Sequence, residues 1–394
     1  MAPNNGTLSE ALSDQALSGQ APVIIAARRS PIGTRGRALA GLRVEDLAAP
    51  VIQAALRDAE NLSGAPITVA DVVLGNCMGP GGNPGRIAAL AAGLGHEVPG
   101  ATVDRQCGSG LAAIVDAAAT IRAGDERIRV AGGVESPSTA PVRSVNGVAY
   151  DRAPFAPADF SDPSMTQAAE NLAALDGISR ERQDAHAARS HARARAARDA
   201  GRFDAELVPL AGLKYDDAIG AAERLLPRLP ALFPGGTLTA GTATRIGDGS
   251  AAVVIAPASY ARSINAPGLA IRASAVVGCD PALPGIGAAG AIQAALRSAG
   301  VELADIDALE IVEAFAVQSL AVIDRIGIDE DDSRLSADGG ALALGHPWGA
   351  SGAVAVVRLF SRLVRSGAPA GTLGVAAASI GGGMGIAAVV EVVR

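Results

Sequence analysis

The sequence predicts an α/β fold built from two similar halves. The first observation is that strand-like apolar runs alternate with helical patterns along most of the chain. The second is an order of serine, helix, glycine, strand and glycine that occurs twice, over residues 109–132 and again over 351–381. Dense alternation predicts a mostly parallel sheet covered by helices on both faces. The repetition indicates that each half offers one loop to a shared site.

The first part of the chain supplies the elements of the first half. Residues 22–27 and 70–74 are short apolar runs typical of buried strands, and residues 43–58 carry apolar side chains at helical spacing. A turn rich in Gly and Pro follows at 75–85. The remaining expected elements are helices at 86–93 and 109–122 and a strand at 128–131.

The middle of the chain, from about 142 to 238, has a different character, with many prolines and few strand-like runs, and is expected to form an inserted subdomain. Its clearest element is an Arg- and Ala-rich helix at about 179–200. Four arginines of this helix could meet an anionic ligand such as a nucleotide phosphate, although a basic helix is more often simply solvated. They are Arg182, Arg189, Arg193 and Arg198.

The last third of the chain has the same alternation as the first. Its expected elements are strands at 269–277, 308–312 and 373–378, helices at 287–299 and 351–365, and a Gly-rich turn at 339–345.

Composition limits the classes of protein to which the chain can belong. The 394 residues include three scattered cysteines and four histidines, which predicts neither a disulfide framework nor a metal site. A net charge of −7 gives no general reason to bind nucleic acid. No apolar run approaches the ~20 residues that span a bilayer. Residues 1–20 lack the features of a signal peptide and are expected to form a disordered tail, so we expect a cytoplasmic protein.

Cys107, in the stretch VDRQCGSG, is the candidate nucleophile. Gly108 and Gly110 would let a bulky thioester approach the backbone, and Ser109 is a plausible N-cap of the following helix. The positive end of the helix dipole is expected to lower the pKa of the Cys107 thiol. The alternative is a buried structural cysteine.

His346 is the second candidate. It is held between Gly345 and Pro347 in a Gly-rich stretch, which is unusual for a histidine that only packs in a core. A cysteine and a histidine from separate loops are the minimum for nucleophilic acyl transfer, with backbone N–H groups of a turn such as 381–383 holding the oxyanion. Taken alone, the histidine could be catalytic or structural.

Several long motifs, in this order and at this spacing, resemble the thiolase family. They are VDRQCGSG, AGGVES at 131–136, SMTQAAEN near 165, GTLTAGTATRIGDGSAA near 240, EAFA at 313–316, GGALALGHPWGASG and SIGGGMG. The likeness extends from about Pro22 to the C-terminus.

This resemblance implies a five-layered αβαβα fold, no permanently bound cofactor, coenzyme A thioesters as substrates, and a homodimer or homotetramer. It implies an N-terminal half at 21–140 plus about 240–267, an inserted CoA-binding loop domain at 141–239, and a C-terminal half at 268–394. Thiolases make or break a carbon–carbon bond between acyl groups carried on CoA.

The family's roles can be carried over to matching residues. Its nucleophile matches Cys107 and its activating histidine matches His346, while the N–H groups of Cys107 and Gly381 match the oxyanion donors of the acyl-enzyme. The segments expected to contact CoA contain Met165, Thr244 and Arg245, and Arg182 is the candidate phosphate ligand on the basic helix.

The sequence departs from the family where the second substrate is handled. Ser379 stands in place of a second cysteine, which acts as acid and base, and Val312 replaces an asparagine of the enolate oxyanion hole. A serine hydroxyl is a poor base without activation. Trp348 stands where small aliphatic residues are usual. Arg245 either contacts a carboxylated substrate or pairs with Asp248.

These departures predict an enzyme that forms an acyl-Cys107 intermediate but passes the acyl group on by modified chemistry. Carbon–carbon bond formation could use a carbanion from decarboxylation, as in the related ketoacyl synthases. The alternatives are transfer to a non-carbon acceptor or water, and a non-catalytic partner of a complete thiolase. The acyl donor is either an acyl-CoA or an acyl carrier protein.

Overall fold

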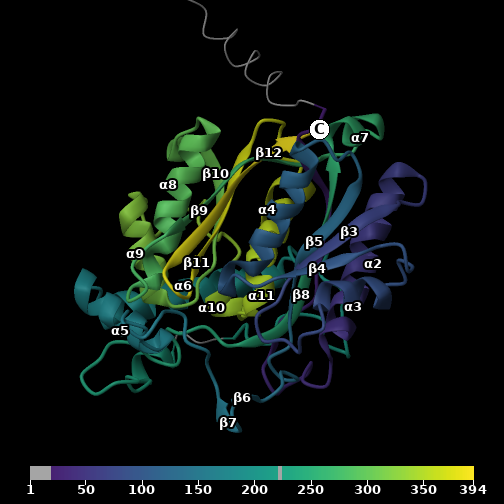
Figure 1. The fold of residues 1–394 in the computed structure, drawn as a ribbon. Helices are drawn as coiled ribbons and strands as arrows, with labels where there is room; N and C mark the ends of the chain where they lie inside the picture. The colour runs from purple at the N-terminus through teal and green to yellow at the C-terminus, as the bar shows by residue number, and fades with distance from the viewer. Residues whose placement is uncertain (1–18, 221–223) are drawn as a thin grey trace, which may run out of the picture.

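The computed structural model describes residues 19–220 and 224–394, so residues 1–18 of the expected tail lie outside the described residues. One large sheet runs through the molecule in the strand order β10-β11-β12-β9-β1-β8-β5-β3-β4, with the short β2 paired to β8 (Figure 1). The two halves of the chain meet where β1 pairs with β9 over two residue pairs.

The N-terminal half contributes one side of this sheet and the helices around it. Its strands are β1 (Pro22–Arg29), β2 (Gly33–Thr34), β3 (Val69–Gly75), β4 (Gly100–Val103), β5 (Ile128–Glu135) and β8 (Gly247–Pro257). Its helices are α2 (Val44–Ser63), α3 (Pro84–Ala91), α4 (Ser109–Arg122) and α7 (Ala258–Ser263), with a 3-10 turn at Gln106–Gly108.

The C-terminal half contributes the other side. Its strands are β9 (Gly268–Gly278), β10 (Ile306–Ile311), β11 (Leu373–Ile380) and β12 (Met384–Val393). Its helices are α8 (Gly287–Ala299), α9 (Ala316–Ile326), α10 (Ala341–Leu344) and α11 (Trp348–Leu359), which continues as a π-helix over Phe360–Arg365.

The apolar core explains the expected five layers. Because successive strand residues point to opposite faces, Ile24 of β1 joins a central cluster while Val23 and Ile25 join an outer one. The central cluster holds residues of α4 and α11, an outer cluster lies under α2 and α3, and another outer cluster lies under α8 and α9. The order is therefore helices, strands, central helices, strands, helices, as a thiolase-like fold requires.

The expectation of a mostly parallel sheet is wrong. Only β3 with β4, β3 with β5, and β10 with β11 pair in parallel, whereas the pairs that involve β1, β8, β9 and β12 are antiparallel. The strand β8, which the sequence interpretation did not identify, lies between β1 and β5 and runs opposite to both. Its run SAAVVIAP was the available signal.

Small residues bring the two central helices into contact. A Cβ atom on Gly110 of α4 would lie 2.8 Å from the Gly349 carbonyl oxygen of α11, and one on Gly352 would lie 2.7 Å from Leu111 Cβ. Such distances exclude a side chain at either position. The close approach places the N-termini of α4 and α11 side by side, and these helices follow the Cys107 and His346 loops.

The segment between β5 and β8 contains the hairpin β6 (Arg143–Val145) and β7 (Val148–Tyr150), the helices α5 (Met165–Asp176) and α6 (Arg180–Asp199), and a 3-10 turn at Leu226–Arg228. In Figure 1 the hairpin projects from the lower end of the molecule. Val142, Val145 and Val148 on and beside it are 60–85% exposed.

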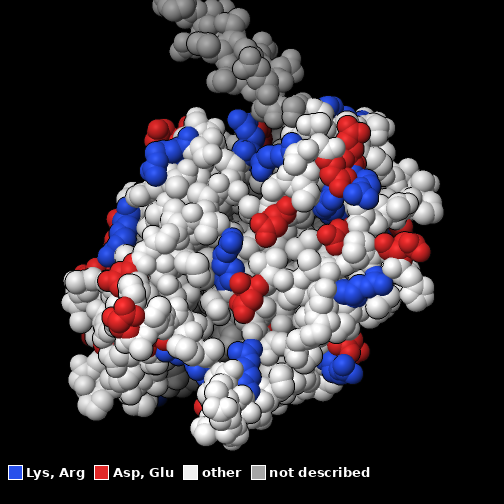
Figure 2. Space-filling model, viewed as in Figure 1, with Lys and Arg blue, Asp and Glu red and all other residues white. Residues whose placement is uncertain are grey.

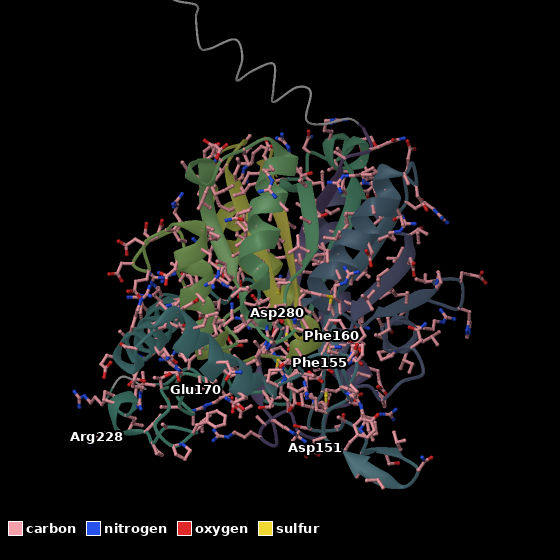
Figure 3. All side chains as sticks on the ribbon, turned by 60° about the vertical axis from the view of Figure 1, so that its left-hand side comes forward. Asp151, Phe155, Phe160, Glu170, Arg228 and Asp280 are labelled. Atoms are coloured by element: carbon pink, nitrogen blue, oxygen red, sulfur yellow. The ribbon has the colours of Figure 1, made fainter. Side chains whose placement is uncertain are left out.

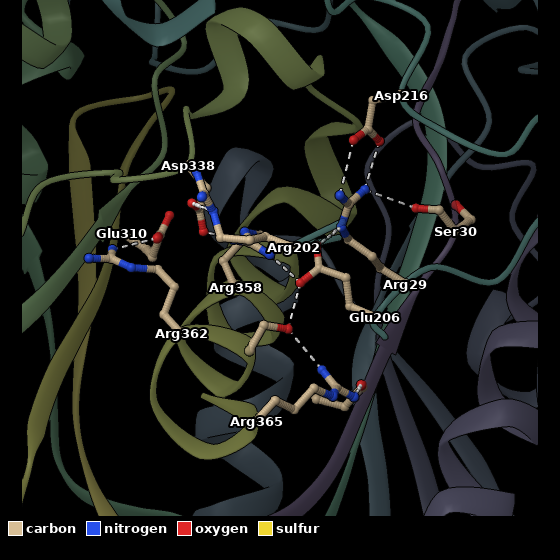
Figure 4. A network of polar contacts seen from close by, with 12 residues as sticks. Arg29, Ser30, Arg202, Glu206, Asp216, Glu310, Asp338, Arg358, Arg362 and Arg365 are labelled. Atoms are coloured by element: carbon tan, nitrogen blue, oxygen red, sulfur yellow. Dashed lines mark hydrogen bonds and ion pairs between the residues drawn. The ribbon is translucent and has the colours of Figure 1, made fainter. Parts of the chain in front are cut away.

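A buried ionic network ties part of this segment to the core (Figure 4). Arg29 of β1 donates to Asp216 (2.7 and 3.0 Å) and to Glu206 (2.7 Å). Arg358 of α11 donates to Glu206 and Asp338. Both guanidinium groups also stack on the Phe203 ring, 5.4 and 4.7 Å from its centre. Two loop segments, at 203–216 and at Asp338, are thereby joined to strand β1 and central helix α11.

No helix in the part of the chain that the structure describes is long and apolar enough to cross a membrane. On the face shown in Figure 2, basic and acidic side chains are interspersed.

Candidate active site

The Cys107 loop connects β4 to α4. Gln106 has a φ of 47°, in the left-handed region, so the chain turns sharply just before the cysteine. The Ser109 hydroxyl accepts a hydrogen bond from the Arg105 N–H (2.8 Å) and donates one to the Gln106 carbonyl (2.6 Å). The N-cap of α4 is Gly108, so the expectation that Ser109 caps the helix is wrong. Ser109 instead fixes the turn that presents Cys107.

The neighbouring glycines serve packing inside the protein. A Cβ atom on Gly108 would lie 2.4 Å from Ile380 Cδ1 of β11, and Gly110 backs onto α11 as described above. Both glycines therefore have a packing role, in addition to the expected one of making room for a thioester, which stays a prediction. Gly108 lets β11 reach the cysteine turn.

His346 comes from the loop between α10 and α11 and faces Cys107. Its backbone N–H donates to the Arg245 carbonyl (2.8 Å), which fixes the loop against the N-terminal half. Its Nε2 atom lies 3.3 Å from Cys107 Sγ, and its Nδ1 atom lies 2.6 Å from Ser351 Oγ. Ser351 also donates to the Pro347 carbonyl at 3.1 Å. Because the Ser351 hydroxyl donates its proton to the Pro347 carbonyl, it accepts a hydrogen bond from His346 Nδ1–H. The other ring nitrogen, Nε2, is then unprotonated and free to accept a proton.

Burial determines the ionisation of this pair. It raises the pKa of the Cys107 thiol to about 11, against the lowering influence of hydrogen bonds from the backbone N–H groups of Gly381 and of Cys107 itself. Burial also lowers the pKa of His346 to about 4. The expected lowering of the cysteine pKa is therefore wrong, because desolvation of the thiolate is the largest influence on it. At neutral pH the pair is an uncharged thiol beside an uncharged imidazole.

Gly381 brings the C-terminal motif to the same place. It starts a turn between β11 and β12 in which Gly382 and Gly383 have φ values of 87° and 80°, a conformation that other residues rarely adopt. A Cβ atom on Gly381 would lie 2.8 Å from the Phe155 ring. The N–H groups of Cys107 and Gly381 thus converge near the sulfur, as an oxyanion hole for an acyl-cysteine requires.

Ser379 lies at the end of β11 with its hydroxyl already engaged. It donates to the Gly285 carbonyl at 2.6 Å and accepts from the Ala288 N–H at 3.0 Å. Because the Ser379 hydroxyl donates its proton to a backbone carbonyl and accepts from a backbone N–H, it is poorly placed to act as a base on a substrate carbon. Val312 is buried, and its N–H donates to the Ala377 carbonyl at 2.9 Å. Neither side chain supplies a base.

Two residues beside the cysteine loop were missed as site residues by the sequence interpretation. The Cys77 thiol donates to the Gln106 carbonyl at 3.1 Å. The buried Glu135 carboxylate accepts hydrogen bonds from the N–H groups of Cys77, Met78 and Gly349 at 2.9–3.0 Å. Burial raises its pKa to about 7. Glu135 lies within the AGGVES motif, which was the available sequence signal. Its hydrogen bond to Gly349 of α11 could be seen only in the structure.

Thr244 and Arg245 lie close to His346, whose N–H donates to the Arg245 carbonyl. Thr244 donates its N–H to the Ala314 carbonyl and its hydroxyl to the Ala341 carbonyl, at 3.0 and 2.6 Å. Arg245 has an exposed side chain, one residue from the bridge between Ile246 and His346. Asp248 is buried and accepts from Ser138, so the alternative that it pairs with Arg245 is wrong.

Met165 and Arg182 are farther along the inserted segment. Met165 is half-buried at the start of α5, the helix that also carries Glu170, and Figure 3 shows Glu170 and Arg228 on the same side of the molecule. Arg182 donates to Asp324 at 2.6 and 2.8 Å and pairs with Glu330 at 3.4 Å. A phosphate at Arg182 would have to compete with these carboxylates.

Within residues 19–220 and 224–394, no group of three or more His, Cys, Asp or Glu residues could hold a metal ion. The groups assembled at Cys107 can instead perform acyl transfer: a thiol nucleophile, an uncharged imidazole within reach of its proton, and two N–H donors beside the sulfur.

Comparison with known proteins gives the same assignment. The family models "Thiolase, N-terminal domain" and "Thiolase, C-terminal domain" match residues 22–259 and 266–392. A Bacillus subtilis protein named "Putative acetyl-CoA C-acetyltransferase YhfS" is 41% identical over 94% of this chain and 99% of its own length. The 3-ketoacyl-CoA thiolase of Salmonella typhimurium is 40% identical over 94% and 98%. The Bacillus anthracis acetyl-CoA acetyltransferase structure superposes with a TM-score of 0.84 at 35% identity, covering 95% of this chain and 99% of that one.

Fold and site define an acyltransferase. The chain belongs to the thiolase family.

Proposed function

We propose that the chain is a thiolase-type acyltransferase that forms an acyl-Cys107 intermediate from an acyl thioester and then makes, or in reverse breaks, a carbon–carbon bond with a second acyl substrate. The observation that carries this proposal is the 3.3 Å contact between His346 Nε2 and Cys107 Sγ beside the Gly381 N–H. The cysteine gives its proton to Nε2 as the sulfur attacks the thioester carbonyl. The N–H groups of Cys107 and Gly381 then hold the negative oxygen until the intermediate collapses and the CoA thiolate leaves with the proton from His346 Nε2, which leaves the acyl group on Cys107.

In the second half of the reaction, the acyl group passes to the second substrate, and here this chain lacks the base that the family normally uses. The Ser379 hydroxyl is bound to backbone groups of Gly285, just before α8, and Ala288, in its first turn, and Val312 offers only methyl groups. We infer that the carbanion arises by decarboxylation of a malonyl-type thioester, which needs no base on the α-carbon. The electron pair of the bond between the carboxylate carbon and the α-carbon passes to the α-carbon as carbon dioxide leaves. The α-carbon then attacks the acyl-Cys107 carbonyl, the carbon–sulfur bond breaks, and Cys107 leaves as a thiolate that takes up a proton from solvent.

Arg245 fits this second substrate. It is exposed and close to His346, and a guanidinium binds a carboxylate through two parallel hydrogen bonds. The donor is proposed to be an acyl-CoA, with Met165 and Thr244 in its binding segments, rather than an acyl carrier protein. Replacing Arg245 with Met should weaken use of malonyl-CoA far more than use of acetyl-CoA as acyl donor. Equal effects on both would assign Arg245 to CoA binding instead.

Transfer of the acyl group to water or to a non-carbon acceptor is the alternative for the same intermediate. Incubation with acetyl-CoA and malonyl-CoA separates the two by product: acetoacetyl-CoA and carbon dioxide on the first account, and free acetate on the second. The Cys107→Ala variant is the control for both. The protein is further proposed to be a cytoplasmic homodimer or homotetramer.

A further inference from the structure

A small cavity lies next to Ser351, whose hydroxyl contacts the His346 ring. It has a volume of about 30 Å³ and is lined by residues of β10, of the loop around α10, and of α11. Ser351, the hydrogen-bond partner of His346 Nδ1, and Val312 are among its lining residues. A buried water needs roughly 10–15 Å³ and two to four polar partners, so the volume admits one or two water molecules.

The lining includes an unpaired buried donor. Arg358 is 1% exposed and lines the cavity. Its terminal nitrogens are engaged, one with Glu206 and the other with Asp338, but its Nε–H has no hydrogen-bond partner among the described residues. Donors of buried cations are rarely left without an acceptor, because the lost hydration is not replaced. An acceptor inside the cavity would satisfy this donor.

Two further polar groups line the cavity. Ser351 Oγ donates to the Pro347 carbonyl and contacts His346 Nδ1, so one lone pair is still open to a donor. Glu310 is buried, its carboxylate is paired with Arg362 at 2.7 Å, and burial raises its pKa. The residues that line the cavity therefore include one unpaired donor, Arg358 Nε–H, and possess acceptor groups on Ser351 and Glu310.

We propose that this cavity is a water site that positions the catalytic histidine. The bound water accepts from Arg358 Nε–H and donates to Ser351 Oγ. Ser351 is then held with its proton on Pro347 and accepts from His346 Nδ1–H. This arrangement fixes the tautomer in which Nε2 is free to take the Cys107 proton. Arg358 is in this account a positioning residue, and the inference rests on the proposed role of His346 as the base.

The direct test is a crystal structure of the wild-type protein at a resolution that shows ordered water. Water density within hydrogen-bond distance of both Arg358 Nε and Ser351 Oγ is expected. An Arg358 Nε bound by a protein group, or a cavity without water, would overturn the proposal.

A filling variant tests the function of the water. Val354→Leu adds one methylene to a lining residue of α11, whereas Val354→Ala removes bulk at the same position and leaves room for water. In protein labelled with ¹⁵N-histidine, the wild type and the alanine variant should show a single His346 tautomer with Nε2 unprotonated. The leucine variant should show a mixture and should react with iodoacetamide at Cys107 about tenfold more slowly, the factor expected for one lost hydrogen bond.

If the leucine variant has a filled cavity in its own crystal structure but keeps the wild-type tautomer and alkylation rate, the water has no positioning role. A His346 that is protonated at Nε2 in the wild-type protein would also show that the water has no positioning role. This outcome does not depend on whether the leucine variant folds. If instead the proposed function is wrong, Cys107 forms no acyl adduct, while the cavity water and the His346 tautomer are still as described.

Discussion

The burial of Cys107 and His346 decides how the nucleophile works. With pKa values of about 11 and about 4, neither group is charged at neutral pH, so the thiolate forms only as its proton moves to Nε2 during attack. Cys107 is therefore expected to react sluggishly with general alkylating agents and faster with thioesters, which bring their carbonyl oxygen to the N–H groups of Cys107 and Gly381.

Glu135 is expected to hold the pKa of Cys107 high through its negative charge. Replacing it with Gln should lower that pKa, because the thiolate no longer faces a nearby carboxylate above pH 7, where Glu135 is ionised. The pH dependence of iodoacetamide alkylation measures this shift. Asp104→Asn is the matched control and should give a smaller fall, since Asp104 acts on Cys107 less strongly. An unchanged midpoint in folded Glu135→Gln protein would refute the electrostatic role.

Ser379 and Val312 together are expected to account for altered second-substrate chemistry. Ser379→Cys alone should raise thiolysis of acetoacetyl-CoA only slightly, because the enolate oxygen still lacks a partner. Adding Val312→Asn should raise it by at least about tenfold further, the effect of one restored oxyanion interaction. Both variants are assayed beside the same changes on Cys107→Ala. A double variant without any gain would mean that other residues limit the reaction.

At the scale of elements, the site depends on two helices whose approach only small residues permit. Sequence patterns singled out Cys107, His346 and Gly381 because each lies in a glycine-rich motif, Cys107 and Gly381 after a strand and His346 before a helix. They could not show that Gly108 and Gly110 face β11 and α11, since which neighbour a glycine touches depends on packing between distant segments. They also missed β8 and hence the antiparallel pairs, because strand direction depends on long-range connections.

The buried ionic network connects the inserted segment to β1 and α11. Replacing Asp216 with Asn should destabilise the protein by about 3–5 kcal/mol, because Arg29 then remains buried with incomplete pairing. Asp199→Asn removes an exposed partner of Arg198 and should cost less than about 1 kcal/mol. Urea unfolding followed by the fluorescence of Trp348, the single tryptophan, measures both. Equal free energies of unfolding for the Asp216→Asn and Asp199→Asn variants would show that the network contributes little to stability.

At the scale of the whole molecule, the exposed valines of the β6–β7 hairpin are expected to contact a second copy of the chain. Changing Val142, Val145 and Val148 to Ser should lower the mass of the assembly in light scattering, because exposed apolar side chains gain most from burial. Acyl transfer per Cys107 should be unchanged, since the hairpin is outside the catalytic groups. An unaltered mass would place the interface elsewhere.

The five-layered fold was predictable at this scale because long motifs cover both halves, from about Pro22 to the C-terminus. The contacts within the segments proposed to bind CoA were not predictable. Arg182 was a candidate from composition alone, yet Asp324 and Glu330 lie beside it, and no local pattern in the basic helix indicates partners about 140 residues away.

The most direct test of the central claim is the mass of the intact protein after mixing with acetyl-CoA and with malonyl-CoA, beside the Cys107→Ala variant. We predict an adduct with the mass of the acyl group on the wild type and none on the variant. If a folded wild-type protein that binds CoA gains no mass from either donor, or if the variant gains the same mass, Cys107 is not the acyl-carrying nucleophile.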